Sequence, residues 1–325
     1  MAQGSPPVTP PTGSSTTAVP GTTVVLPGRR GIRPSRFVSS LLFVGPALVL
    51  IGFFIVYPTI RTIILSLYAQ AGIGYNAPLK FIGLDNYSNM TQDSGMGTAV
   101  VNNLLWLVVV TPATIVLGVI FAVLFDRVRY EAVAKSIVFI PMAISATAAG
   151  VIWKLMYADD PHTGTINAIL QRILPHFQGI SFLGDSSFVN FALMGAQVWL
   201  SLGFAVVILS AALKAIPRDL TEAARIDGAT ELQIFRRITV PLMWPTITVI
   251  ATLTMIGVLK LFDIVYTMTN GGPAGASTVL ALRMYVESFA NANPGYGSAI
   301  AVVLLIAVMP IMALNIRRFR SEGPR

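Results

Sequence analysis

The sequence has no cysteine, only two histidines and few charged side chains. Asp, Glu, Lys and Arg make up 11% of its 325 residues, whereas ordinary soluble domains contain roughly 25%. Without cysteine there is neither a disulfide framework nor a thiolate metal site, and His162 and His176 are too few and too far apart for an imidazole cluster. We therefore expect no metal site, no cofactor and no redox chemistry.

Catalytic signatures are missing as well. The chain contains no Gly-x-x-x-x-Gly-Lys-Ser/Thr phosphate loop, no nucleophile elbow and no carboxylate pair accompanied by a histidine. Gly72 and Gly74 mimic part of a dinucleotide fingerprint, but no strand-like segment precedes them. We expect a chain that neither binds ATP itself nor catalyses a reaction.

Long apolar segments are what the sequence has in abundance. Apolar residues make up 54% of the chain, and its mean hydropathy is +0.72. About 20 apolar residues suffice for a helix to cross a hydrocarbon core about 30 Å thick, so the pattern predicts an all-α membrane protein with six transmembrane helices. The predicted spans are 38–60, 100–125, 136–157, 188–213, 240–268 and 298–316. Most of them contain a proline, and the sequence therefore predicts kinked helices.

The distribution of basic residues predicts the topology. If the amino terminus is cytoplasmic, 16 of the 22 Lys and Arg residues fall in cytoplasmic segments, as expected from the retention of positive charge inside. Both termini and the loop 214–239 are then cytoplasmic. The net charge of +8 is spread over the ends of apolar segments rather than gathered on a soluble domain, which argues against nucleic acid as a partner.

The two ends of the chain differ from the apolar region between them. Residues 1–28 contain six prolines, many Thr, Gly and Ser, and no charged residue, a composition that cannot bury enough apolar surface to become ordered. We predict a disordered cytoplasmic tail over 1–35, a transmembrane domain over 36–320 and a short tail over 321–325. The amino-terminal segment is not predicted to be a signal peptide, because no basic start precedes an apolar core.

The loop 214–239 carries the most distinctive local pattern. Small residues surround Gly228, which tolerates the left-handed backbone that ends a helix sharply, so we predict two short helices joined by a tight turn. Asp219 with Glu222, and Thr230 with Gln233, have the spacing of capping boxes for the first and second helix. Small side chains would let the surface of a partner approach the backbone closely.

This loop resembles the EAA loop of permease subunits in binding-protein-dependent ABC importers. Further blocks are similar to the sugar-importing branch, which includes maltose-type and glycerol-3-phosphate-type permeases. The matching segments are Glu-Ala-Ala at 222–224, Asp-Gly-Ala at 227–229, Pro241, Phe-Ile-Gly-Leu-Asp-Asn-Tyr at 81–87, and residues 262–273 and 297–301. The block at 81–87 resembles the first of the two permeases in such importers. The resemblance covers residues 36–320 and implies the type I importer permease fold.

The resemblance also implies partners and a mechanism. It suggests a second permease subunit, two copies of a cytosolic ATPase subunit, an extracytoplasmic solute-binding protein and a sugar substrate, in a multi-pass protein of the bacterial cytoplasmic membrane. ATP hydrolysis would belong to the separate ATPase, and the docked loop would act as a lever on the helix bundle. The ATPase-coupling residues implied in this way are Glu222, Ala223, Ala224, Asp227, Gly228, Ala229, Phe235 and Pro241. An ordinary amphipathic connector lying on the inner leaflet is the alternative for this loop.

Polar and aromatic side chains in the spans are candidates for the substrate path. Lys260 and Asp263 lie three residues apart and are expected on one helical face, where they either bind sugar hydroxyls or join the fifth span to a neighbouring helix. Flat rings suit the apolar face of a sugar ring, although aromatic residues in membrane proteins are commonly interface anchors. Tyr266 and Trp199 are the preferred aromatic candidates.

Other functions remain open at this stage. A glycerol-phosphate cargo would require more positive charge than Lys260, and Arg283 is the obvious further candidate. An ion-gradient transporter or channel working without ATP would need a network of embedded acidic residues, and the spans contain almost none apart from Asp263.

Overall fold

The computed structural model describes residues 34–72, 77–174, 177 and 179–321. These belong to two compact units, residues 1–57 and 58–325. The predicted tails, 1–35 and 321–325, lie outside the described residues except for 34, 35 and 321. Most of the described chain is helical, which confirms the predicted fold class. Its strands, β1 (Tyr68–Gln70) and β2 (Leu79–Phe81), form an antiparallel hairpin in which Tyr68 pairs with Phe81.

The first unit contains one long apolar helix. Helix α1 (Pro34–Ile51) continues through a π-helical turn, η1 (Gly52–Val56), into α2 (Tyr57–Leu65), whose first residue ends this unit. Pro46 lies inside α1 without ending it. Residues 38–60, the first predicted span, are therefore helical throughout.

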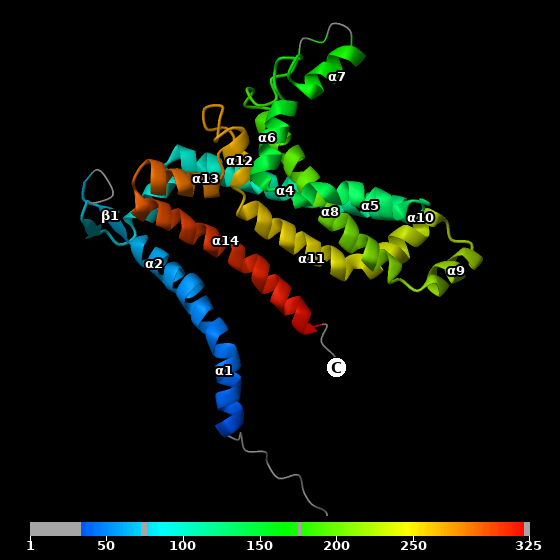
Figure 1. The fold of residues 1–325 in the computed structure, drawn as a ribbon, viewed down its shortest axis with the longest axis horizontal. Coiled ribbons are helices and arrows are strands. Elements are labelled where there is room, and N and C mark those ends of the chain that lie inside the picture. Colours follow the sequence, from blue (N-terminus) through cyan, green and yellow to red (C-terminus); the bar gives the residue numbers. More distant parts are fainter. Residues whose placement is uncertain (1–33, 73–76, 175–176, 178, 322–325) are drawn as a thin grey trace, which may run out of the picture. The chain divides into compact units, whose positions relative to one another are not determined.

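The second unit holds the remaining helices, among which α4, α8, α11 and α14 are the long ones (Figure 1). Helix α4 packs against both α8 and α11, and α11 also packs against α14. The helices of this unit after α2 are α3 (Asp85–Gln92), α4 (Ser94–Asp126), α5 (Glu131–Phe139), the 3₁₀ turn η2 (Ile140–Ala143), α6 (Ala146–Met156), α7 (Thr165–Ile173), α8 (Val189–Lys214), α9 (Arg218–Ile226), α10 (Glu231–Ile234), the π turn η3 (Phe235–Thr239), α11 (Val240–Leu259), α12 (Asp263–Met268), α13 (Leu280–Tyr285), the π turn η4 (Val286–Ala290) and α14 (Pro294–Ser321).

The described residues contain all six predicted apolar segments, with two important differences from the predicted spans. Five continuous helices are long and apolar enough to cross a membrane, and α5 with α6 makes a sixth if this bent pair is counted as one span. The prediction of a single span over 136–157 is wrong in its geometry, because α5 and α6 meet at 102°. Pro141 is the second residue of the 3₁₀ turn between them, and its missing N–H and fixed backbone favour such an interruption.

The fifth predicted span, 240–268, is also placed differently. The continuous helix starts earlier, at Glu231, runs through α10, η3 and α11, and ends at Leu259. The chain then breaks, and α12 is a separate short helix. The backbone N–H of Val240 bonds to the carbonyl of Phe235, so the π turn lies immediately before Pro241. Pro241 has no N–H and cannot donate a helical hydrogen bond. The π turn changes the hydrogen-bond register of the helix next to this residue.

The core of this unit consists of buried apolar side chains from facing helices. Trp106 of α4, Leu193 of α8 and Ile264 of α12 form one cluster, and Leu209 of α8 and Met243 of α11 belong to another. Small residues allow close helix contacts, as is common in membrane bundles. A Cβ atom at Gly203 of α8, for example, would lie 2.5 Å from the carbonyl oxygen of Val138 in α5.

Candidate functional site

Helices α9 and α10 form a hairpin, residues 218–234, whose turn is set by Gly228. Gly228 has a φ of +82°, in the left-handed region that side chains disfavour. The N–H of Gly228 donates to the carbonyl of Arg225 (3.0 Å), and that of Ala229 donates to the carbonyl of Ala224 (2.9 Å). These two bonds form a Schellman motif that closes α9. The predicted pair of short helices with a glycine pivot is confirmed.

The caps of the two helices differ from each other. Thr230 and Gln233 form a complete capping box, with Thr230 N–H donating to Gln233 Oε1 at 2.8 Å, as predicted. The predicted box of Asp219 and Glu222 is wrong, because α9 begins after Pro217 and has no side-chain cap. Asp219 lies inside the first turn, where its carboxylate meets the positive end of the helix instead of capping it.

Ion pairs connect the hairpin across its turn and to α4. Arg225 binds Glu231 through two hydrogen bonds, Nε to Oε1 at 2.7 Å and Nη2 to Oε2 at 3.3 Å. Arg127, directly after α4, lies 3.8 Å from the same carboxylate. All three side chains are exposed, so solvent and salt weaken these pairs. They orient the hairpin more than they stabilise the fold.

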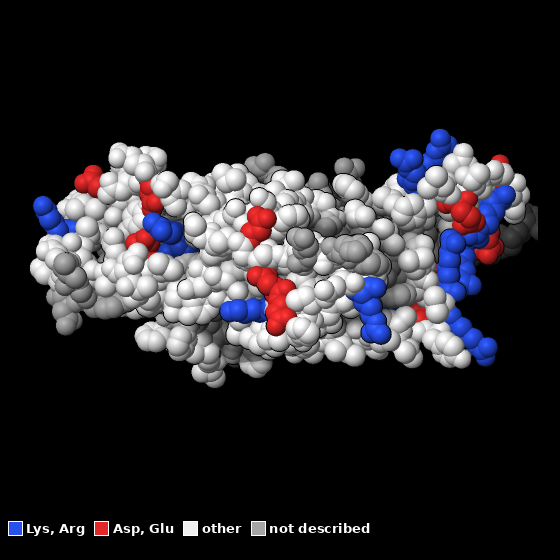
Figure 2. Space-filling model, turned by 90° about the horizontal axis from the view of Figure 1, so that it is seen from above, with Lys and Arg blue, Asp and Glu red and all other residues white. Residues whose placement is uncertain are grey.

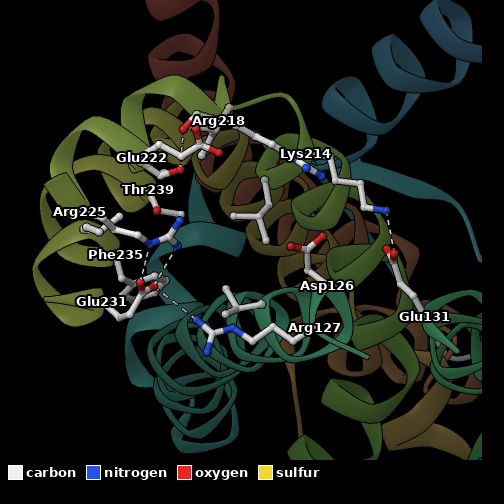
Figure 3. Close-up of a pocket in the computed structure, with 15 residues that line it drawn as sticks. Asp126, Arg127, Glu131, Lys214, Arg218, Glu222, Arg225, Glu231, Phe235 and Thr239 are labelled. Atoms are coloured by element: carbon white, nitrogen blue, oxygen red, sulfur yellow. Dashed lines mark hydrogen bonds and ion pairs between the residues drawn. The ribbon is translucent and has the colours of Figure 1, made fainter. Parts of the chain in front are cut away.

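The hairpin and the adjacent ends of α4, α5 and α8 enclose a cavity of about 830 Å³ (Figure 3). Charged side chains are concentrated around this end of the molecule (Figure 2). Within the cavity the two signs balance, since four acidic and four basic residues line it. They are Asp126, Glu131, Glu222, Glu231, Arg127, Lys214, Arg218 and Arg225. Such a lining suits contact with a protein surface better than a highly charged phosphate ligand.

The predicted coupling residues occupy two different environments. On the hairpin, Glu222, Ala223, Asp227 and Gly228 are exposed, while Ala224 and Ala229 are half-buried. Beyond the hairpin, Phe235 is half-buried against the cluster that contains Met243, whereas Pro241 is exposed. Phe235 thus packs against the bundle just beyond the hairpin, and Pro241 follows the π turn.

Lys260 and Asp263 do not share a helical face, contrary to the prediction. Lys260 is the residue after α11, and Asp263 is the first residue of α12. Between them Leu261 is buried, and the break in the helix removes the spacing that would align their side chains. Both are exposed, and no ion pair joins them in the described part of the chain.

Tyr266 and Trp199 belong to separate aromatic groups. Tyr266 stacks on Phe262 with centroids 5.1 Å apart and meets Tyr285 edge-on at 5.5 Å; its exposed fraction is 42%. Trp199 is half-buried and meets Trp153 edge-on at 5.6 Å. The ring contacts therefore do not bring the two predicted aromatic candidates into one binding site.

Three buried asparagines form a polar network that the sequence did not reveal. Asn102 donates to the carbonyls of Ala276 and Thr278, both at 2.8 Å. Asn190 of α8 donates to Ala276 as well and to Asn102. These bonds satisfy the backbone of a nonhelical segment between α12 and α13, as any irregular chain packed among membrane helices requires.

Asn103 extends this network to both sides of the helix break. Its Oδ1 accepts from the N–H of Leu280 at 2.8 Å, and its Nδ2 donates to the carbonyl of Val258 at 3.4 Å. One side chain of α4 therefore contacts the end of α11 and the start of α13. The sequence signal for this network is the pair of adjacent asparagines, Asn102 and Asn103, inside an apolar span. The residues that Asn103 bonds lie 155 and 177 positions away in the sequence.

Arg283 is held in an ionic cluster at the start of α4. It lies 2.8 Å from Asp93 and 3.0 Å from Glu287, and the Tyr296 hydroxyl donates to Asp93 at 2.8 Å. Burial alone would raise the pKa of Asp93, but the hydrogen bonds from Tyr296 and Arg283 outweigh it and hold the pKa below its usual value. Two carboxylates thus neutralise Arg283, the residue considered for binding a phosphate.

Comparison with known proteins places these features in a family. A family model described as the inner membrane component of binding-protein-dependent transport systems matches residues 114–320. An osmoprotective compounds uptake permease protein of Synechocystis is 47% identical over 285 residues, covering 86% of this chain and 99% of the relative. An alpha-glucoside transport system permease protein of Rhizobium meliloti is 42% identical over 299 residues, covering 90% and 86%.

A solved structure shows the same fold. A chain of a bacterial ABC transporter involved in the import of alginate, an acidic polysaccharide, aligns with a TM-score of 0.75 at 21% identity, covering 89% of this chain and 98% of that chain. The expected permease fold is therefore confirmed. Together with the family model and the two relatives, this likeness shows that the chain belongs to the inner-membrane permease components of binding-protein-dependent transport systems.

Proposed function

We propose that this chain is one membrane-spanning subunit of an ATP-driven, binding-protein-dependent importer whose cargo is a sugar. The observation that carries the proposal is the hairpin of α9 and α10, which presents small and acidic side chains at one end of a bundle of apolar helices. A permease subunit provides the path for the cargo across the membrane. The free energy for transport must come from a partner that hydrolyses ATP.

The hairpin is the surface on which the ATPase subunit docks. Ala223 and Gly228 have little or no side chain and are exposed, so a partner surface can approach the backbone closely. Glu222 and Asp227 add negative charge to the same surface and suit basic groups on the partner. The Schellman motif and the capping box make the hairpin rigid before docking, which reduces the entropic cost of binding.

The hairpin transmits motion because α10 continues without a break into α11. Residues 231–259 form one helix, so a displacement of the hairpin displaces the membrane helix with it. A partner shifts the bundle between conformations only by binding them with different affinity. Closure of two ATPase subunits on ATP provides that difference, while a second permease subunit completes the path and a solute-binding protein delivers the cargo.

A neutral sugar fits the described residues better than a phosphorylated cargo. A phosphate ester would favour a second cation besides Lys260. Arg283 does not supply that charge, because it is paired with Asp93 and Glu287. The relatives named above take up alpha-glucosides or osmoprotective compounds, and we propose a glucoside or another small polyhydroxylated solute for this chain. Tyr266 and Trp199 remain proposed contacts, each on a different part of the path.

An uptake assay tests the proposal. The chain would be reconstituted with its second permease, ATPase and binding protein, and ATP-dependent uptake of labelled maltose, trehalose and sucrose would be compared with glycine betaine. We expect Ala223→Trp to abolish both uptake and ATPase retention on the membrane, because the large side chain blocks close approach. Ala132→Trp, at an exposed position of α5, is the matched control. Undiminished uptake by Ala223→Trp would remove the hairpin from the mechanism.

A further inference from the structure

Helix α7 buries an asparagine and exposes two isoleucines. Asn167 is fully buried and faces the protein, where its side chain donates to the carbonyls of Ala158 and Ile180 and accepts from the N–H of Ile180, all at 3.0 Å. These three bonds fix the rotation of the helix about its axis. The side of α7 opposite Asn167 must therefore face outward.

That outward side carries two isoleucines. At about 100° per residue, Ile169 lies about 160° and Ile173 about 120° around the helix from Asn167, and their exposed fractions are 52% and 67%. Thr165 and Arg172 are exposed on the same side. Leu174, directly after the helix, is also exposed. In water a surface helix places such residues inward and its amide side chains outward, so the arrangement indicates an apolar surrounding on the outward side.

The position of α7 indicates what that surrounding is. Helix α6 leaves α5 at 102°, nearly at a right angle, and carries α7 sideways from α4 and α8 (Figure 1). Where α6 ends, the ring of Tyr157 meets those of Trp153 and Phe182 at tilted angles, with centroids 5.1 and 5.0 Å apart. These rings belong to the core of the bundle, so they fix the base of the arm, while α6 exposes Leu155 beside them.

Helix α7 itself carries one charge, which is positive, and Asp159 and Asp160 lie in the turn before it. Residues 164–180 contain no Asp or Glu, and Arg172 is exposed on the flank of the helix. A short helix that exposes aliphatic side chains with a basic residue beside them is typical of segments that lie in the membrane interface.

We propose that α7 is an interfacial anchor, with Ile169, Ile173 and Leu174 inserted into the outer part of the bilayer and Arg172 at the phosphate level. The proposal depends on the assignment as a membrane protein and not on the cargo or on the coupling hairpin. In this arrangement the arm formed by α6 and α7 follows the bilayer surface. The bent third span is then held by the helix bundle at one end and by lipid at the other.

The absence of cysteine from the chain makes a direct test available. Single variants Ile169→Cys and Ile173→Cys would be labelled with an environment-sensitive fluorophore in the assembled transporter, in nanodiscs of phosphatidylethanolamine and phosphatidylglycerol. Gln171→Cys, an exposed position on the side of Asn167, is the matched control. We expect quenching by lipids spin-labelled near the headgroup to be about twofold or more stronger at 169 and 173 than at 171.

Two results would overturn the proposal. Quenching of positions 169 and 173 by aqueous iodide to the same extent as position 171 would show that the aliphatic side faces water. Shielding of 169 and 173 from both lipid and aqueous quenchers would show that a partner protein covers α7. If one cysteine variant fails to assemble, the other carries the same test, because both residues lie on the same side of the helix.

Discussion

Two regions of irregular backbone are held in place in opposite ways. One is the turn of the hairpin of α9 and α10, and the other is the segment between α12 and α13. The hairpin closes itself with local bonds around Gly228 and Thr230 and is tied down by exposed ion pairs. The segment that includes Ala276 has its carbonyls bound by buried asparagines from two other helices. One region is rigid in itself and accessible, while the other is rigid only within the bundle.

This difference follows from the surroundings of each region. An exposed backbone group can bond to water, so the hairpin needs only enough internal bonds to keep its shape. A buried carbonyl without a partner costs free energy, so the segment 276–280 requires a donor for each group. We expect substitutions to affect folding in the buried region and coupling in the exposed one.

The largest effect is expected from Asn102→Ala. The carbonyl of Thr278 would lose its donor and that of Ala276 one of two donors, which should lower the free energy of unfolding by about 2 to 3 kcal/mol. Thermal unfolding of the purified transporter, followed by size-exclusion chromatography, measures this loss. Asn89→Ala, at an exposed position of α3, is the control, and an equal effect of both variants would contradict the role of the buried network.

A smaller effect on stability, with a complete effect on transport, is expected from Gly228→Val. A Cβ atom at Gly228 would have open space around it, with no contact within 4 Å beyond its own chain neighbours. The strain is therefore that of the left-handed backbone alone, about 1 to 2 kcal/mol. The turn should distort, and sugar uptake should be lost while the protein remains in the membrane.

Two further variants sharpen this prediction. Gly228→Asn should retain most uptake, because Asn tolerates the left-handed region. Gly97→Val, at a glycine that also has open space but no positive φ, should transport normally. Loss of uptake in Gly228→Asn while Gly97→Val transports normally would mean that glycine at 228 matters for a reason other than its backbone.

Glu231→Gln should affect coupling more than stability. The change removes the charge that Arg225 and Arg127 share, and exposed pairs of this kind contribute little to folding. We expect unchanged membrane insertion, nearly unchanged thermal unfolding and a partial loss of ATP-dependent uptake. The exchange Arg225→Glu with Glu231→Arg should restore part of the uptake; no recovery would argue against orientation of the hairpin by this pair.

The smallest effect concerns pH and the cluster around Asp93. Because the pKa of Asp93 is lowered in the folded protein, its bonds to Arg283 and Tyr296 stabilise the fold above the ordinary carboxyl pKa of about 3.9 and are lost as the pH falls below it. Asp93→Asn should therefore unfold at a lower temperature than the parent at neutral pH, and the gap should narrow below about pH 4. Asp85→Asn, at an exposed position of α3, should show no such convergence.

Some features of the site could be predicted from sequence because their causes are local. At the end of α9, Gly228 donates to a carbonyl three positions earlier and Ala229 to one five positions earlier, and Thr230 meets Gln233 three positions later. The failure at Asp219 is also local, since Pro217 moved the start of α9 and left Asp219 inside the first turn. A shift of two residues is enough to change a cap into an ordinary helical position.

Other features could not be predicted because their partners are distant in sequence. The expectation for Lys260 and Asp263 assumed an unbroken helix, yet the chain breaks after Leu259, where Asn103 binds the carbonyl of Val258 and the N–H of Leu280. The bend between α5 and α6 was signalled by Pro141, but its angle depends on what each half packs against, α8 for the first and mainly α12 for the second.

The sequence by itself determined the class of protein, the number of apolar spans and the form of the hairpin, because hydropathy and short-range hydrogen bonding act within a few turns of one helix. The tertiary structure alone decided where the third and fifth spans break, which carbonyls the asparagines satisfy and which side of α7 faces outward. Those outcomes depend on pairing groups that are up to 177 residues apart, and only packing brings such groups within bonding distance.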